Sequence, residues 1–545
     1  MLVKLHAAAL RGVDAVPVTV EVRVDRGIHF LMVGLPDSAV RESQQRIKSA
    51  IEHLGFRWPG KGITINLAPA GLRKEGAAYD LPLAMGILAA SEQIEPRALD
   101  GILMMGELAL DGALRPVRGG LALAQAVSTP GIGSLILPRS SAEEAALLPN
   151  VQSLPADHLA QVLDHVSGAR LLRPIPCDIE GLLARQSAAS TELLADIRGQ
   201  ERAIAAMAIA AAGGHNVCMV GPPGAGKSML ARAMAGLLPP MSVSEAIEVN
   251  RIHSVSDRLI KRDGVILQRP FRSPHHTISD VALAGGGSDP RPGEISLAHA
   301  GVLFLDELPE MPRNVLEVLR QPMESGEMIV SRARSTVQFP AAFQLVAAMN
   351  PCPCGMYSHD PQKRKNCSCS RHSRQQYIRK VSGPLLDRID IHLEIDPVPA
   401  NALLPEMGAL GRKQREERRV RSNLWGKKVQ AARKTQTLRN PGGATNHQLD
   451  GQDLHEIVAL DRHGKTLLQR SMEHFGFSAR THTRILRMAR THADLEERKG
   501  VEARDIAAAI ALRRAGRDTE KWITSSALPD THLFSGPFGS TEQEV

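Results

Sequence analysis

The residues best suited to chemistry lie in one short stretch, where an apolar run is followed directly by a glycine-rich loop. The run His215–Val220 leads into Gly221–Ser228, which reads GPPGAGKS and matches the pattern G-x-x-x-x-G-K-[ST]. In such a loop, backbone N–H groups point at phosphate oxygens, the lysine reaches the outer phosphates and the last hydroxyl binds Mg²⁺. The sequence therefore predicts a site for a nucleoside triphosphate, ATP, with Mg²⁺.

Every residue of this loop is a predicted nucleotide contact: Gly221, Pro222, Pro223, Gly224, Ala225, Gly226, Lys227 and Ser228. Met229–Leu238 is predicted to be a helix whose N-terminus completes the anion site. A glycine-rich turn that matches by chance is the alternative, but a strand before the loop and a helix after it favour the phosphate loop.

Two carboxylates follow a second apolar run. Val302–Leu305 has the pattern of a buried strand, and Asp306 and Glu307 come directly after it. Asp306 is suited to the Mg²⁺ shell, and Glu307 to polarising the water that attacks the outer phosphate. Many strands end in acidic residues, yet this pair follows a phosphate loop in an α/β pattern. We therefore expect an ATPase.

The segment before the phosphate loop resembles the AAA+ ATPases, because Asp196–Gln200 (DIRGQ) is similar to their I-x-G-Q element. The resemblance implies that Asn350, at the end of an apolar run, orients the attacking water. It also implies that Arg480, in the run FGFSAR, senses the γ-phosphate from a helical lid. A turn residue before Pro351 and an exposed helix position are the respective alternatives.

Arg388 lies in the segment GPLLDRID, Gly383–Asp390. The same resemblance implies that it projects from one subunit into the nucleotide site of the next and stabilises the charge that develops in phosphoryl transfer. A surface ion pair with Asp387 or Asp390 is the alternative.

The first 165 residues alternate between strand and helix patterns, which predicts an α+β domain. Strands are expected at Val16–Gly27, His29–Pro36, Gly62–Pro69 and Ser134–Pro138, and helices at Ser38–Phe56 (capped by Ser38) and Leu81–Ile94. This order resembles the proteolytic domain of Lon proteases. Ala78 stands where that family has its nucleophilic Ser, and Ala124 where it has its Lys. A methyl group cannot attack a carbonyl, so we expect no protease. An unrelated α+β domain is the alternative.

Four of the six cysteines lie close together, as Cys352-x-Cys354 and Cys367-x-Cys369. Four thiolates suit tetrahedral Zn²⁺ in a closed structural site. The C-x-C spacing is tighter than usual, so His359 or His372 could replace one thiol. Free or redox-active thiols are the alternative to zinc.

The chain is basic, with a net charge of +8, and the charge is concentrated. Arg412–Arg439 holds eleven Lys/Arg and two Glu, a local charge of +9. A hairpin pattern over Met323–Pro340 carries two arginines near its tip, and the loop between the cysteine pairs adds three cations. The expected DNA contacts are Arg332, Arg334, Lys363, Arg364 and Lys365. Together these features favour binding to a phosphate backbone over solvated surface charge.

Composition sets the remaining limits. A chain of 545 residues is expected to hold three to four domains. No run of 18 apolar residues and no signal peptide is visible, which predicts a cytoplasmic protein without a membrane partner.

Two longer stretches identify a family. Ser273–Glu310 and NPCPCG (Asn350–Gly355) resemble the magnesium-chelatase-like AAA+ ATPases of the YifB/ComM type. The resemblance covers about residues 1–515 and implies a hexameric, ring-shaped DNA helicase that drives branch migration in natural transformation and homologous recombination, with recombination or competence proteins as possible partners.

The expected fold class is α/β, with an AAA+ core between a Lon-like α+β domain and a helical lid. The predicted parts are residues 1–165 (Lon-like domain), 166–195 (linker), 196–400 (AAA+ core with hairpin and four-Cys loop), 401–515 (lid with basic stretch) and 516–545 (disordered tail). Two other functions stay open: the ATPase subunit of a metal chelatase, which remodels a protein, and a regulator that uses ATP as a switch.

Overall fold

The structure is a computed structural model that describes residues 1–186, 192–256, 265–287, 290–332, 335–358, 366–398 and 408–524. The chain forms two compact units, each assembled from several stretches. Unit 1 comprises Met1–Glu192, Ala235–Phe304 and Asn314–Gln344, and unit 2 comprises Leu193–Met234, Leu305–Arg313 and Leu345–Val545. The elements mix helices and sheets, in agreement with the predicted α/β class.

Unit 1 contains a seven-stranded sheet of order β3-β4-β2-β1-β5-β8-β9. Its strands are β1 (Leu2–Arg11), β2 (Asp14–Asp25), β3 (Phe30–Val33), β4 (Gly62–Ala68), β5 (Ile102–Met104), β8 (Ser134–Pro138) and β9 (Gln152–Ala156). The long hairpin β1–β2 is antiparallel, whereas β5, β8 and β9 run parallel. β2, β3, β4 and β8 fall on the four predicted strands, while β1 and β9 were not expected.

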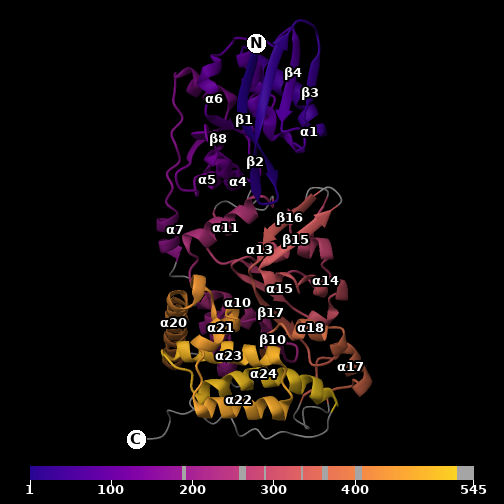
Figure 1. The fold of residues 1–545 in the computed structure, drawn as a ribbon, viewed down its shortest axis with the longest axis vertical. Helices are drawn as coiled ribbons and strands as arrows, with labels where there is room; N and C mark the ends of the chain where they lie inside the picture. The colour runs from indigo at the N-terminus through magenta and orange to yellow at the C-terminus, as the bar shows by residue number, and fades with distance from the viewer. Residues whose placement is uncertain are drawn as a thin grey trace. The chain divides into compact units, whose positions relative to one another are not determined.

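Helices pack on this sheet and complete one apolar core. They are α1 (Ser38–Arg41), α2 (Ser43–His53), α3 (Asp80–Ala90), α4 (Gly120–Gln125), α5 (Arg139–Ala145) and α6 (Leu159–Ser167). Figure 1 shows α1, α4, α5 and α6 in indigo and purple beside the strands. Helix α7 (Ile179–Gln186) belongs to a separate cluster of buried residues. Helix α3 is buried along its whole length, so its sequence lacks a polar face.

Two expectations for unit 1 need correction. The single helix predicted over Ser38–Phe56 is two helices, and its cap is Asp37, whose carboxylate accepts a hydrogen bond from the Val40 N–H at 2.8 Å. The segment expected as a linker is partly helical, because it contains α7. Ile179 in this helix is buried against Met241 and Val249.

The rest of unit 1 comes from the middle of the chain. Its main elements are α11 (Val243–Ser254), α13 (Glu294–Leu297), α15 (Pro322–Ser325), β11 (Phe271–Arg272), β14 (Val302–Leu305), β15 (Glu327–Arg332) and β16 (Ser335–Pro340). The antiparallel pair β15–β16 confirms the predicted hairpin, although α15 occupies its expected start.

Unit 2 is built on β10 (Val217–Val220), which runs parallel between β17 (Gln344–Met349) and β18 (Ile391–Glu394). Its helices are α8 (Glu192–Ala195), α9 (Glu201–Gly213), α10 (Lys227–Leu237), α17 (Arg371–Arg379), α18 (Gly383–Leu386), α20 (Gly408–Arg439), α21 (Gly451–Ile457), α22 (Arg462–Phe475), α23 (Ala479–Leu495) and α24 (Ala503–Thr524). Helices α22, α23 and α24 pack together as the helical part of the unit (Figure 1).

The end of the chain differs from the expectation. α24 continues to Thr524, so the first part of the predicted disordered tail is helical, and residues 525–545 lie outside the described residues. Among the described helices, none combines the length and the apolar character needed to cross a membrane.

Candidate functional site

The phosphate loop lies between β10 and α10, as the sequence predicts. All four residues of β10 are buried. Gly224 and Gly226 adopt φ of +75° and +87°, a left-handed conformation that favours glycine. A Cβ atom on Gly221 would lie 2.5 Å from the Ile395 carbonyl oxygen, so this position also requires glycine. The loop therefore keeps its backbone close to the sheet and leads directly into the helix N-terminus.

Lys227 is buried and holds the loop together. Its Nζ donates to the carbonyl oxygens of Gly221 (2.8 Å) and Pro222 (3.0 Å) and to Oδ1 of Asn350 (3.1 Å). Burial lowers the pKa of Lys227, while the charges of Asp306 and Glu307 act in the opposite direction. The ammonium group thus lies where the loop, the end of β17 and two carboxylates meet.

The two carboxylates follow β14, whose residues are buried. The Ser228 hydroxyl donates to Oδ2 of Asp306 at 3.1 Å, although the two residues are 78 positions apart. A hydroxyl and a carboxylate are the hard oxygen ligands that Mg²⁺ prefers, so this pair fits the predicted metal. Glu307 is exposed beside it and adopts φ of +51°. A non-glycine residue in this conformation is strained, which is common at functional sites.

Comparisons with known proteins agree with this geometry. The family models described as magnesium chelatase, subunit ChlI, as subunit ChlI of Mg-chelatase, and as magnesium chelatase, subunit ChlI C-terminal match residues 193–403, 20–141 and 420–513. The uncharacterized protein YifB of Escherichia coli (strain K12) is 41% identical over 94% of this chain and 97% of its own length. Competence protein ComM of Haemophilus influenzae is 40% identical over 95% of this chain and 98% of its own length.

The chain belongs to the magnesium-chelatase-like AAA+ family of the YifB/ComM type. The likeness to a chelatase subunit itself is narrower. The magnesium-chelatase 38 kDa subunit of Cereibacter sphaeroides is 30% identical over 28% of this chain and 51% of its own length.

The two predicted arginines lie in different surroundings in this YifB/ComM-type chain. Arg388 follows α18, is half-buried, and donates from Nη1 to the Pro384 carbonyl at 2.8 Å. Arg480 is exposed in the first turn of α23. Among the interactions described for residues 408–524, none joins Arg480 to the phosphate loop. Its predicted role at the γ-phosphate stays a prediction.

A buried carboxylate anchors the segment that carries Arg388, and sequence reasoning missed it. Asp390 is fully buried, accepts a hydrogen bond from the Asn216 N–H at 3.1 Å, and lies 2.8 Å from Nδ1 of His447. Burial opposes its charge, yet His447, His215 and Arg484 hold the pKa of Asp390 well below its usual range. The sequence signal was a charged residue placed directly before β18, whose first three residues are buried.

The four cysteines come together as predicted. Sγ of Cys352 lies 3.4 Å from that of Cys354 and 3.8 Å from that of Cys367, and all four sulfur atoms, including that of Cys369, lie within 4.8 Å of one another. His372 lies on α17, where its ring contacts Gln376. The four thiols alone therefore form a set that fits Zn²⁺.

The thiols differ in acidity, and their segment touches the phosphate loop. Burial opposes ionisation of Cys354, but hydrogen bonds from the Met356 N–H and the neighbouring thiols lower its pKa to about 6. Burial raises the pKa of Cys352 to about 12. A Cβ atom on Gly355 would lie 2.7 Å from Cδ of Pro223, so the cysteine segment packs directly against the loop.

The predicted DNA contacts are described only in part. Arg332 ends β15, although its side chain lies outside the described residues, as do Arg334, Lys363, Arg364, Lys365 and His359. The basic stretch is one helix, α20, and part of its charge is used inside unit 2. Arg439 pairs with buried Asp494 at 2.6 Å, Arg421 with Glu201 at 2.6 Å and Lys428 with Glu496 at 3.1 Å. The +9 of the sequence therefore overstates the charge available to a ligand.

Proposed function

We propose that this YifB/ComM-type protein is an ATP-dependent, ring-shaped DNA motor, a hexamer that remodels branched DNA in natural transformation and homologous recombination. The observation that carries the ATPase part is the convergence of Lys227, Ser228, Asp306 and Asn350 through direct hydrogen bonds. These residues come from three separate stretches of the chain. Chance packing does not account for the meeting of these four side chains, which supports a shared function.

In this proposal each side chain has a distinct task. Lys227 exchanges its loop carbonyl partners for the β- and γ-phosphates, and Asn350, already in contact with Lys227, orients the attacking water. Ser228 and Asp306 hold Mg²⁺, which neutralises charge on the phosphates. Glu307 polarises the water.

The neighbouring subunit completes the site in this proposal. Arg388 reaches the nucleotide of the next chain, and its position depends on Asp390, two residues on. Asp387 pairs with Arg513, and Asp390 contacts Arg484 and His447, so both carboxylates of the motif have other partners. Arg480 acts from the lid.

The DNA part rests on the exposed cations of α20 and on the name of the relative, competence protein ComM. Arg412, Lys413, Arg415, Lys427 and Lys434 are exposed. Cations of this kind displace counterions from a phosphate backbone without reading sequence. The first domain, in this proposal, is a Lon-like fold without protease chemistry.

Zinc at the four cysteines is part of the same proposal, because their segment packs against Pro223. We expect about one Zn²⁺ per chain, lost when Cys352 and Cys354 are both changed to Ser. Cys177→Ser is the matched control, since Cys177 lies outside the cluster. Metal-free protein with full ATPase activity would reject a structural zinc.

The deciding experiment measures ATP turnover with forked, single-stranded and four-way-junction DNA, together with DNA affinity as a function of salt. Each phosphate contact is expected to add about 0.9 to the slope of log K against log salt for duplex. The triple variant R412A/K413A/R415A is expected to lower that slope by about 2.7, since it removes three such contacts. R462A/K465A/R470A removes three exposed cations from α22 and is the matched control.

A second function is favoured by the family descriptions, which name a magnesium chelatase subunit. Such a subunit uses ATP to remodel a protein partner. If the protein has this function, no DNA structure changes its rate of ATP turnover, and it shows no salt-dependent DNA binding. That result would replace the DNA motor with a protein-remodelling ATPase.

A further inference from the structure

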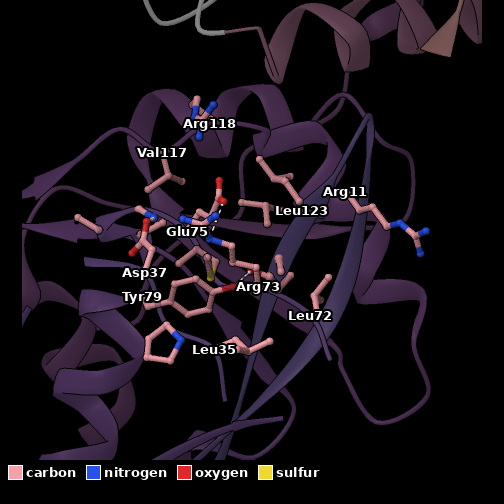
Figure 2. A pocket seen from close by; sticks show the side chains of 18 of the residues that line it. Arg11, Leu35, Asp37, Leu72, Arg73, Glu75, Tyr79, Val117, Arg118 and Leu123 are labelled. Atoms are coloured by element: carbon pink, nitrogen blue, oxygen red, sulfur yellow. Dashed lines mark hydrogen bonds and ion pairs between the residues drawn. The ribbon is translucent and has the colours of Figure 1, made fainter. Parts of the chain in front are cut away.

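Unit 1 contains a cavity of about 810 Å³ that the proposed ATPase does not use. The end of β1, the turn after β3 and the segment Gly71–Tyr79 form most of its wall, and Ala78 is part of it. Figure 2 shows Arg11 extending away from the cavity. Arg73 pairs with Glu75 at 3.0 Å, so these two charges are used within the fold. The lining therefore indicates no class of ligand, and the contacts that extend the proposed function lie in unit 2.

The segment that carries Arg388 is held from two sides within unit 2. On one side lies Asn216, the residue directly before β10, the strand that leads into the phosphate loop. Its carbonyl oxygen accepts hydrogen bonds from the N–H groups of Asp390 (3.2 Å) and Ile391 (3.0 Å), and its own N–H donates to Oδ2 of Asp390 at 3.1 Å. These contacts fix the end of the segment to the strand that precedes the phosphate loop.

On the other side lies buried Arg513 of α24, which contacts the residues directly before and after Arg388. Its Nη1 donates to the carbonyl oxygen of Ile389, and its Nη2 lies 3.6 Å from Oδ1 of Asp387. Nη1 also donates to Nε2 of His392 at 2.7 Å, since a guanidinium has no lone pair to accept with. Burial and the charge of Arg513 lower the pKa of His392 to about 3, so this ring is neutral and can accept. One arginine thus holds the backbone on both sides of Arg388.

A second arginine reaches the segment from α23. Nη1 of Arg484 lies 3.5 Å from Oδ1 of buried Asp390, and the Arg484 side chain is 12% exposed. Residues four positions apart are neighbours on one side of a helix, so Arg484 lies one turn after Arg480 on α23. Arg480 is the residue whose proposed role is at the γ-phosphate of its own chain. In the proposed function, α23 therefore connects a chain's own nucleotide with the segment that carries Arg388.

Stability alone explains these ion pairs poorly. A buried arginine loses hydration energy that its ion pairs recover only in part, and apolar residues often replace such pairs without loss of stability. The Asp387 side chain is 56% exposed, so its pair with Arg513 adds little to the free energy of unfolding. The presence of arginine at position 513 therefore points to a role in placing Arg388.

We propose that Arg513 and Arg484 are positioning residues, which hold Arg388 in place for the nucleotide of the neighbouring subunit. Because both belong to the helical part of their own chain, a shift of α23 and α24 relative to β10 releases the segment and withdraws Arg388. Nucleotide bound in one chain, sensed by Arg480, thereby controls hydrolysis in the next. This inference rests on the proposed role of Arg388 and adds the groups that control it.

The test measures steady-state ATP turnover by the full chain, without DNA, for R513Q and R484Q. Each variant keeps every group of its own phosphate loop, so KM for ATP should change by less than about two-fold, whereas kcat should fall at least about ten-fold. D387N changes an exposed side chain, which keeps the fold intact, and should lower kcat by about three-fold.

R498Q is the matched control. Arg498 is 16% exposed and pairs with buried Asp505 at 2.5 Å, but none of its described interactions involves residues 387–392. The variant loses an ion pair of the same helical part, so its unfolding free energy should fall while its kcat matches that of the unchanged protein.

Two further measurements separate positioning from a structural role. If Arg513 acts through Arg388, the double variant R388A/R513Q should turn over ATP at the rate of R388A alone. Mixed rings of R513Q and K227A chains should regain part of the activity, because the K227A chains supply a correctly placed Arg388 and the R513Q chains supply an intact phosphate loop.

The proposal is wrong if R513Q and R484Q keep kcat within about two-fold while R388A loses it, a result that leaves the role of Arg388 intact. It is also wrong if R388A/R513Q is slower than R388A, if R498Q loses as much kcat as R513Q, or if confirmed mixed rings show no recovery. Full turnover by R388A alone would instead reject the proposed role of Arg388, and this inference would fall with it.

Discussion

The phosphate-loop region of unit 2 and the cavity of unit 1 both bring together residues from distant stretches, but they differ in what they bring. Around Lys227 the converging groups are an ammonium, a hydroxyl, a carboxylate and an amide, joined by hydrogen bonds of 3.1 Å. In the cavity, Ala78 contributes a methyl group, and buried Ala124 lies next to the lining residue Leu123. This cavity is thus kept although the two positions that resemble the Lon nucleophile and base carry only methyl groups.

The largest effect is expected at Glu307. Glu307→Gln keeps the size of the side chain but removes the carboxylate that we propose polarises the water, so ATP turnover should fall about 10³-fold with nucleotide affinity retained. Steady-state hydrolysis and equilibrium nucleotide binding measure the two quantities. If the variant hydrolyses ATP at nearly the rate of the unchanged protein, the assignment of Glu307 as the water-polarising residue is wrong.

A similar loss, about 10³-fold, is expected for Arg388→Ala, because the variant lacks the cation that we propose stabilises the transferred phosphoryl group. If the residue acts on the neighbouring subunit, mixed rings of R388A and K227A chains should regain part of the activity. Confirmed mixed rings without any recovery would exclude action between subunits.

The two units are expected to respond to pH in opposite directions. Burial raises the pKa of Glu144 in unit 1 to about 7, against hydrogen bonds from Ser254 and the Gly120 N–H. Its contribution to stability is complete below about pH 4.5 and is lost as the pH rises through 7, by at most about 3 kcal/mol because the residue is half-buried. Asp390 in unit 2 has a lowered pKa, so its contribution is present at neutral pH and is lost in acid.

Urea unfolding at pH 5 and pH 8 tests this contrast. Glu144→Gln should reduce the difference between the two pH values. Asp390→Asn should destabilise the protein at both, because it leaves His447 and Arg484 facing an uncharged group in a buried site. An unchanged pH difference in E144Q would assign the effect to other groups.

The smallest effect is expected for Ala78→Ser. The residue lines a cavity with room for a hydroxyl, so unfolding free energy should change by less than about 0.5 kcal/mol. No peptide hydrolysis should appear, since Ala124 supplies no base. Casein digestion and ATP turnover are measured, and both should match those of the unchanged protein. That result would support a site without protease chemistry. New proteolysis would contradict it.

The sequence predicts elements best where a local pattern decides them. The run before Gly221 and its glycines were sufficient for β10 and the phosphate loop, and the spacing of the four cysteines was sufficient for their cluster. β1 was missed because Leu2–Arg11 is rich in alanine and lacks clear alternation. The contact of Asp390 with His447 was missed because it joins a strand to a helical region far along the chain, and no local signal records such a contact.

The left-handed backbone of Glu307 has a consequence for how the protein changes under selection. Glycine accepts φ of +51° without strain, so Glu307→Gly would remove a local cost at this position. Selection for thermal stability alone would therefore favour loss of the carboxylate, and selection for turnover would keep it if Glu307 polarises water as proposed. Residue 307 is thus a position where homologues that have abandoned ATP hydrolysis should be recognisable from a single glycine or asparagine.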